Sequence, residues 1–315
     1  MPVTSLAPDP ARCLLVPFAS ALDPAALTAL RALTLPCLTE LLPRLQVTAE
    51  AGGGEWLYTP PHERALADAM GLTGEDGALP WAALESTQPG EAQAWFHPVH
   101  FQVGMDQVSL LPASGLDEAC SRQLFDALAP LCAEDGVTLE FVSAQRWRAR
   151  GERLGQLSCA SLGRVWGRSV APWQPRGPQA PWLRRLQSEA QMLFYTHPAN
   201  DALAAAGQAP VNGFWADGAG AMTASPQASA PRTLDDLRTA ALQGDWPSWA
   251  RSWERLDANE LPALLEASQR GEPVRLILCG ERRAVAFTNG PRHRLTGWLR
   301  HFRRPTHPAL LLETL

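Results

Sequence analysis

The 315-residue chain contains no lysine, and its 27 basic residues are all arginines. A Walker-type phosphate loop, a Schiff-base lysine and a lysine general base are therefore excluded. Acidic residues outnumber the arginines at 32, which gives a formal net charge of -5. Because no overall positive field is present to attract nucleic acid, we do not expect direct nucleic-acid binding.

Cysteines are few, and long apolar runs are missing. The six cysteines form no C-x-x-C pair, and their spacing matches no zinc module. Free thiols in a reducing compartment are the preferred interpretation. The first residues lack the basic start of a signal peptide, and no apolar run approaches the roughly 20 residues of a membrane span. We therefore expect a soluble, cytoplasmic protein without membrane contact.

What is present is a globular composition, with 46% apolar and 19% charged residues. Apolar or alternating segments at 12–18, 101–111 (with a bulge at Gly104), 137–150 and in a terminal hairpin over 274–289 are typical of strands. Amphipathic segments predict helices after Asp23, after Pro36, between Pro61 and Gly71 and over 116–136. This alternation favours an α/β fold with a central mixed sheet and flanking helices.

Composition also suggests how the chain is divided. Residues 221–232 are small and polar, and we interpret them as a linker or mobile loop. We expect the main α/β domain to span residues 1–220. Residues 233–315 would form C-terminal helices and the terminal hairpin, which we expect to pack on the same core.

Polar side chains are densest in residues 181–220. A helix over 181–196 would align Arg184, Gln187, Gln191 and Tyr195 in one stripe, which could bind an anion or a polar ligand. The alternative is a solvated helix face followed by asparagines that close turns with their own side chains. The candidate ligand-binding residues are Arg184, Gln187, Gln191, His197, Asn200, Asn212, Trp215, His100 and Gln102.

Two histidines, His97 and His100, flank Pro98 and Val99. In an extended chain this spacing places them on opposite faces, so a shared metal site would require a turn. A hydrogen-bonded structural pair is the alternative. His100, at the head of a strand, and His197 are the candidate catalytic residues. We predict no metal site and no other cofactor.

The C-terminal part carries aromatic and basic clusters. Trp246, Trp249 and Trp253 recur at helical spacing, which fits either an aromatic platform for a partner or a buried helix face. Residues 292–304 hold five arginines interleaved with aromatic residues. Basic residues with aromatics can hold single-stranded nucleic acid, but the net charge is negative, and an exposed arginine-rich surface helix is the alternative. The two clusters could also form a surface for a protein partner.

The segment HPAN…AAAGQAPVNGFWADGAG is similar to the H-P-V-N…P-x-N-x-[FIL]-W-x-x-G-x-G segment of archaeal-type, cofactor-independent phosphoglycerate mutases. PPHERALADAMGL, HPVHFQVGMDQV, SLGRVWGRSV and LRRLQSEAQMLFYTHPAN more closely resemble the RpfE-type regulatory proteins, which are often labelled mutase-like. The resemblance implies a degenerate alkaline phosphatase or phosphoglycerate mutase architecture. It also implies a nuclease partner, since RpfE-type proteins are often encoded beside a single-strand-specific exonuclease.

The chain departs from the mutases where their metals bind. Their first strand ends in an L-D-G motif with a metal-binding aspartate, whereas this chain has Pro17 and Phe18 there. Their later D-x-x-G-H motif has no counterpart. Two-metal phosphoryl transfer needs several clustered Asp and His ligands, so we predict that this site has been lost.

Three functions follow as hypotheses. The first is a regulatory or ligand-binding protein that binds a small anionic ligand or a protein partner. The second is an enzyme acting on a phosphate ester or small acid through His100, His197 and Arg184. The third is an interaction module for a DNA-processing nuclease that uses the C-terminal tryptophans and arginines.

Overall fold

A computed structural model describes residues 10–113, 115–289 and 308–315. The chain forms two compact units. The first unit comprises Met1–Trp56, Pro60–Gly71 and Pro226–Leu315, and the second comprises Leu57–Thr59 and Leu72–Ser225. One boundary between the units, at Ser225 and Pro226, falls within the predicted linker 221–232. The N-terminal segments, however, belong to the unit of residues 226–315, because N-terminal and C-terminal strands share one sheet. Such non-local pairing leaves no local sequence signal.

The first unit contains a mixed five-stranded sheet in the order β2-β10-β9-β1-β8. Strand β1 (Cys13–Val16) lies parallel to both β8 (Arg232–Thr233) and β9 (Arg275–Cys279). Strand β10 (Arg283–Thr288) runs antiparallel to β9 and to the edge strand β2 (Gln46–Gly52). The mixed sheet and the terminal hairpin confirm the predictions. Strand β2 was not predicted, because it is mostly exposed and lacks an apolar run.

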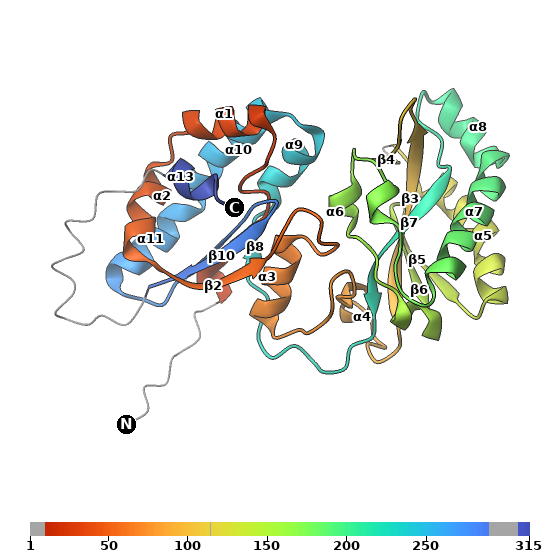
Figure 1. Ribbon diagram of the computed structural model, residues 1–315, viewed down its shortest axis with the longest axis horizontal. Coiled ribbons are helices and arrows are strands. Elements are labelled where there is room, and N and C mark those ends of the chain that lie inside the picture. The colour runs from red at the N-terminus through yellow and green to blue at the C-terminus, as the bar shows by residue number, and fades with distance from the viewer. Residues whose placement is uncertain (1–9, 114, 290–307) are drawn as a thin grey trace. The chain divides into compact units, whose positions relative to one another are not determined.

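Helices cover both faces of this sheet (Figure 1). Helix α3 packs on the face that carries Leu15 and Ile277, and the other helices pack on the face that carries Leu14 and Leu276. Asp23 caps α1 and Gly71, at φ 70°, ends α3, as their sequences predict. The helical elements are η1 (Pro10–Arg12), α1 (Pro24–Ala32), α2 (Pro36–Leu41), η2 (Leu42–Arg44), α3 (Pro61–Met70), η5 (Asp235–Leu237), α9 (Arg238–Gln243), α10 (Trp246–Asn259), α11 (Leu261–Arg270) and α13 (Pro308–Leu312).

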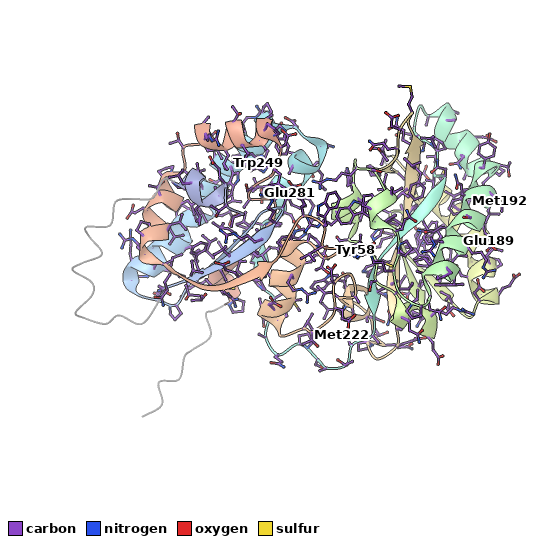
Figure 2. The ribbon with its side chains drawn as sticks, in the orientation of Figure 1. Tyr58, Glu189, Met192, Met222, Trp249 and Glu281 are labelled. Carbon is purple, nitrogen blue, oxygen red and sulfur yellow. The ribbon has the colours of Figure 1, made fainter. Side chains whose placement is uncertain are left out.

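The tryptophans of α10 face the interior of the first unit. Trp249 and Trp253 are fully buried, and Figure 2 shows Trp249 among the core side chains. Their indole N–H groups donate to the backbone oxygens of Phe18 and Ala19, at 2.9 and 3.1 Å. These bonds hold the turn after β1, where Phe18 adopts an uncommon φ of 56°. The tryptophan stripe is therefore a buried helix face, and the arginines at 292–304 lie outside the described residues.

The second unit is built around the long strand β3 (Gln93–Val103). Strands β4 (Val108–Pro112), β6 (Arg146–Arg150) and β7 (Gly213–Gly220) all pair with β3 in the antiparallel sense, and β5 (Thr138–Ser143) pairs with β6. One face packs against α5, α7 and α8, and the other carries a smaller cluster that includes Val99 and Trp215. The helical elements are α4 (Trp81–Leu84), α5 (Glu118–Glu134), η3 (Glu152–Gln156), α6 (Leu162–Val165), η4 (Ala171–Trp173), α7 (Ala180–Tyr195) and α8 (Pro198–Ala205).

Several local predictions for the second unit were wrong. Residues 101–111 are not one bulged strand. They lie in a β3–β4 hairpin in which the Gly104 N–H donates to the Gln107 carbonyl oxygen at 2.8 Å. The segment after 137 forms two strands. Asn200 lies within helix α8, and Asn212 directly precedes strand β7. The first two errors arose because the polar residues between paired strands carry no strong turn signal in the sequence. Strand β7 was missed because its glycines suggest a loop, although pairing with β3 compensates for them.

Both units are α/β structures, so the fold class is confirmed. Within the described part of the chain, no single helix has the length and apolar character needed to cross a membrane. The bent pair formed by residues 24–32 and 36–44 passes that test only jointly.

Candidate functional site

Asn200, the most buried of the predicted polar site residues, is saturated with backbone partners. Its side-chain amide donates to the carbonyl oxygens of Phe194 and Val211, at 2.7 and 2.8 Å. Its Oδ1 accepts from the Val211 N–H at 2.8 Å. The side chain thus ties the end of α7 to the segment that leads into β7.

Other polar residues of this stretch support β7 in the same way. The Asn212 side chain accepts from the Phe101 N–H at 2.7 Å and donates to the Phe101 carbonyl at 2.9 Å, which prolongs the β3–β7 ladder. The Trp215 indole donates to the Ala160 carbonyl at 2.8 Å. Gln187 donates to the Phe214 carbonyl at 3.2 Å. These side chains therefore form hydrogen bonds with backbone N–H and carbonyl groups beside or within the sheet.

The remaining predicted residues are dispersed. Arg184 donates to the Pro175 carbonyl, His197 caps α8 by accepting from the Ala199 N–H, and His100 Nδ1 lies 2.9 Å from the Pro210 carbonyl oxygen. Gln191 and Gln102 are exposed. Figure 2 shows the neighbouring Met192 on the outer side of α7. The structure therefore gathers Gln187, Asn200, Asn212 and Trp215 around β7 as backbone supports, and the predicted residues bind backbone groups rather than one another.

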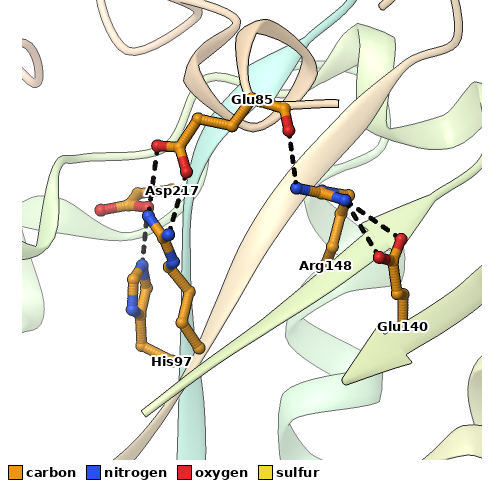
Figure 3. A network of polar contacts seen from close by, with 6 residues as sticks. Glu85, His97, Glu140, Arg148 and Asp217 are labelled. Carbon is orange, nitrogen blue, oxygen red and sulfur yellow. Dashed lines mark hydrogen bonds and ion pairs between the residues drawn. The ribbon is translucent and has the colours of Figure 1, made fainter. Parts of the chain in front are cut away.

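A different pair of polar side chains meets on the sheet face that carries Val99 and Trp215. His97 Nε2 lies 2.9 Å from Asp217 Oδ1, and both side chains are 14% exposed (Figure 3). The second carboxylate oxygen, Oδ2, accepts from the backbone N–H of Leu162 at 2.8 Å, at the start of α6. His97 and His100 are three residues apart on continuous strand β3, so they point to opposite faces, as their spacing predicts.

A β-bulge sets the position of Asp217. Trp95 pairs with Asp217 but Gln93 pairs with Gly220, so β7 carries one extra residue at this point. Gly218 within the bulge has a φ of 61°, and a Cβ atom there would lie 3.1 Å from the Trp95 ring. Only glycine fits this backbone comfortably. The Asp-Gly-x-Gly sequence thus allows Asp217 to reach His97.

Arg146 and Trp95 extend this face. The Arg146 guanidinium lies 4.0 Å from the Trp95 ring centroid and forms a two-pronged ion pair with Glu85, at 3.2 and 2.9 Å. Trp147 pairs with Phe96 in the β3–β6 ladder, so one further step in register brings Arg146 opposite His97. We call the group His97, Asp217, Arg146 and Trp95 the His97 site.

Arg148 supports the same face from a more buried position. It donates to the Glu140 carboxylate, with both distances 3.1 Å, and to the Glu85 backbone oxygen at 3.0 Å (Figure 3). Its guanidinium also lies 4.8 Å from the Trp95 ring centroid. A buried guanidinium needs partners of this kind. Through them Arg148 holds in place both Trp95 and Glu85, the two residues that Arg146 also contacts. The His97 site therefore combines an imidazole suited to acid–base chemistry with a partly exposed cation.

The nearby thiol of Cys159 is not a reactive group. Burial, and secondarily the negative charge of Asp217, raise the pKa of Cys159 well above its ordinary value. The protonated thiol is a poor nucleophile and a poor metal ligand. Cys159 therefore belongs to the structure of the second unit and not to the chemistry of the His97 site.

Possible metal ligands are not clustered in the described part of the chain. Over residues 10–113, 115–289 and 308–315, no group of three or more His, Cys, Asp or Glu side chains could hold a metal ion. In the turn after β1, the Phe18 and Ala19 carbonyl oxygens accept from indole N–H groups.

Comparisons with known proteins give only distant likenesses. No protein-family model matches the chain, and no curated protein is significantly similar to it. A cofactor-independent phosphoglycerate mutase from Thermoplasma acidophilum aligns at 13% identity with a TM-score of 0.36, covering 88% of this chain and 89% of the mutase. The PH0037 protein from Pyrococcus horikoshii aligns at 14% identity with a TM-score of 0.42, covering 89% of this chain and 87% of that protein. Neither value supports the transfer of an activity.

Sequence reasoning considered His97 only as a metal ligand or a structural residue and did not select Asp217 or Arg146. The available signal was Gly218 directly after Asp217, since a glycine within a strand often marks a bulge that re-aims a neighbouring side chain. The partners of Asp217 could not be read from that signal, because His97 lies 120 residues away.

Proposed function

We propose that this chain is a ligand-binding protein of the RpfE-type, mutase-like group, with a regulatory role, and that its ligand is a small anion. The observation that carries the proposal is the fixed ring of His97. Asp217 holds Nε2, while Nδ1 has no hydrogen-bond partner within the described residues. Nδ1 is not one of the fully buried side-chain atoms that lack a partner, so it is open to water or to a ligand.

Arg146 supports an anionic ligand. Its side chain is 35% exposed, and that of its partner Glu85 is 48% exposed. An exposed ion pair contributes only about 0–1 kcal/mol, so a ligand carboxylate or phosphate can replace Glu85 at little cost. The guanidinium fork already holds a carboxylate through two nitrogens, which is the geometry that such ligands require.

The test is isothermal titration calorimetry and thermal-shift measurement with phosphorylated three-carbon acids and nucleotides. His97→Asn and His100→Asn make a matched pair, because the same substitution is placed on opposite faces of β3. We expect His97→Asn to weaken binding by roughly tenfold or more, about 1.4 kcal/mol, while His100→Asn binds like the parent protein. Equal affinities, a loss confined to His100→Asn, or no binding of any anion by the parent would contradict the proposal.

An enzymatic role is the second candidate, favoured by the same observation. An imidazole oriented by a carboxylate can act as a general acid or base on a phosphate ester or small acid. Turnover of the same compounds that falls with His97→Asn would favour catalysis at the His97 site. A fall with His100→Ala would instead favour the sequence-based candidate. Metal content measured by mass spectrometry tests the proposed loss of the two-metal site, and two divalent ions per chain would contradict it.

The proposal of a nuclease partner rests on the resemblance alone. Trp249 and Trp253 are buried and cannot form a docking platform without unfolding α10. A pull-down with the full chain and with variants of the exposed α10 residue Arg251 would test whether this part of the first unit contributes.

A further inference from the structure

The hydrogen bonds of Asp217 fix which nitrogen of His97 carries the proton. As a carboxylate, Asp217 can only accept hydrogen bonds. Its Oδ2 accepts from the Leu162 N–H, which is necessarily a donor, and its Oδ1 faces His97 Nε2 at 2.9 Å. Nε2 must therefore carry a proton, and the neutral ring then has its lone pair on Nδ1.

We infer that His97 presents Nδ1 to the ligand as a hydrogen-bond acceptor, and that the ligand is an anion bearing a hydroxyl group. This inference rests on the proposed function, since it takes the His97 site as the place of binding. Arg146 would pair with the ligand's phosphate or carboxylate, while His97 Nδ1 would accept from its hydroxyl group. A hydroxylated anion can engage both groups at once, whereas an anion without an O–H leaves the Nδ1 lone pair to water and gains no bond from it.

Two other histidines of the second unit serve as internal controls, because their hydrogen bonds require different nitrogens to carry the proton. His197 Nδ1 accepts from the Ala199 N–H at 3.2 Å, so His197 must also carry its proton on Nε2. His100 Nδ1 faces the Pro210 carbonyl oxygen at 2.9 Å, so His100 must carry its proton on Nδ1. The structure thus predicts one tautomer for His97 and His197 and the other for His100.

The first test needs no ligand. Long-range proton–nitrogen NMR spectra of the full chain with 15N-labelled histidine distinguish the two tautomers at about pH 8, where an ordinary imidazole is neutral. His97→Asn, His100→Asn and His197→Asn assign the signals. We expect an Nε2–H signal for His97, and a shift of that signal towards a tautomer mixture in Asp217→Asn. An Nδ1–H tautomer, or a His97 signal that Asp217→Asn leaves unchanged, would overturn the inference.

The second test uses two matched compounds, glycerol 3-phosphate and n-propyl phosphate, which share the phosphate but differ in hydroxyl groups. We expect the hydroxylated compound to bind roughly tenfold or more tightly to the parent, and this preference to disappear in His97→Asn. Equal binding of the two compounds would overturn the assigned ligand class. If neither compound binds, the proposed function fails for three-carbon phosphates, and the NMR result alone decides the inference about His97.

Discussion

The Asn200–Asn212 region and the His97 site lie in the same unit and are both rich in polar side chains, but they differ in what remains unsatisfied. The Asn200 and Asn212 amides are bonded to backbone groups on both their oxygen and nitrogen atoms. His97 has one nitrogen bound and one without a partner in the described part of the chain. A dense set of polar residues therefore does not by itself indicate a ligand site, because all of their donors and acceptors can form hydrogen bonds within the protein.

The largest expected effect is a loss of stability when Asn200, in the Asn200–Asn212 region, is replaced. Asn200→Ala leaves the Val211 N–H and two carbonyl oxygens without their partner in a buried setting, so we expect a loss of about 3 kcal/mol in the free energy of unfolding. Urea unfolding monitored by tryptophan fluorescence measures it. Asn259→Ala, at an exposed position on α10, is the control and should change stability by less than about 0.5 kcal/mol. Similar small losses for both variants would show that the Asn200 bonds are dispensable.

A smaller effect concerns the anchoring of α7 and depends on pH. Burial raises the pKa of Asp135, but contacts that include the Arg185 guanidinium, at 2.7 Å, outweigh burial and lower the pKa overall. The unfolded chain then binds more protons, so this stabilisation is present above the ordinary aspartate pKa of about 3.9 and is lost as pH falls through the lower folded value.

Asp135→Asn should therefore reduce stability by about 1 kcal/mol near neutral pH and flatten the acid limb of the stability profile below about pH 4. Urea unfolding at several pH values measures both effects. Asp106→Asn, at the exposed tip of the β3–β4 hairpin, is the matched control. An acid limb that is equally steep in the parent and in Asp135→Asn would show that this carboxylate does not contribute.

The smallest effect tests the predicted helix stripe. Gln191 and Tyr195 are exposed on α7, so Gln191→Ala and Tyr195→Ala should change stability by less than about 0.5 kcal/mol. Both α7 variants should also bind anions with the affinity of the parent protein. Calorimetry on these variants and on His97→Asn under the same conditions measures this. A loss of affinity in the α7 variants with normal binding by His97→Asn would return the site to residues 181–220 and remove the contrast between the regions.

Local patterns predicted much of the helical structure and little of the strand pairing. Asp23, Pro61 and Gly71 marked helix ends correctly, because caps act through backbone groups within a few residues. The apolar terminal hairpin was equally clear. Strands β2 and β7 were missed, because β2 is an exposed edge strand and β7 contains three glycines and a bulge. Such strands depend on partners that are distant in the sequence.

By itself, the sequence determined the α/β class, the main helices and the opposite orientation of His97 and His100, since each follows from local periodicity. Tertiary structure alone decided that β1 lies between β8 and β9, that Asn200 is saturated and that Asp217 meets His97 across 120 residues. The physical reason is the range of the interactions. Helix caps and strand alternation act over a few residues, whereas strand pairing joins segments at any separation. Only that pairing determines which polar atoms remain without a partner.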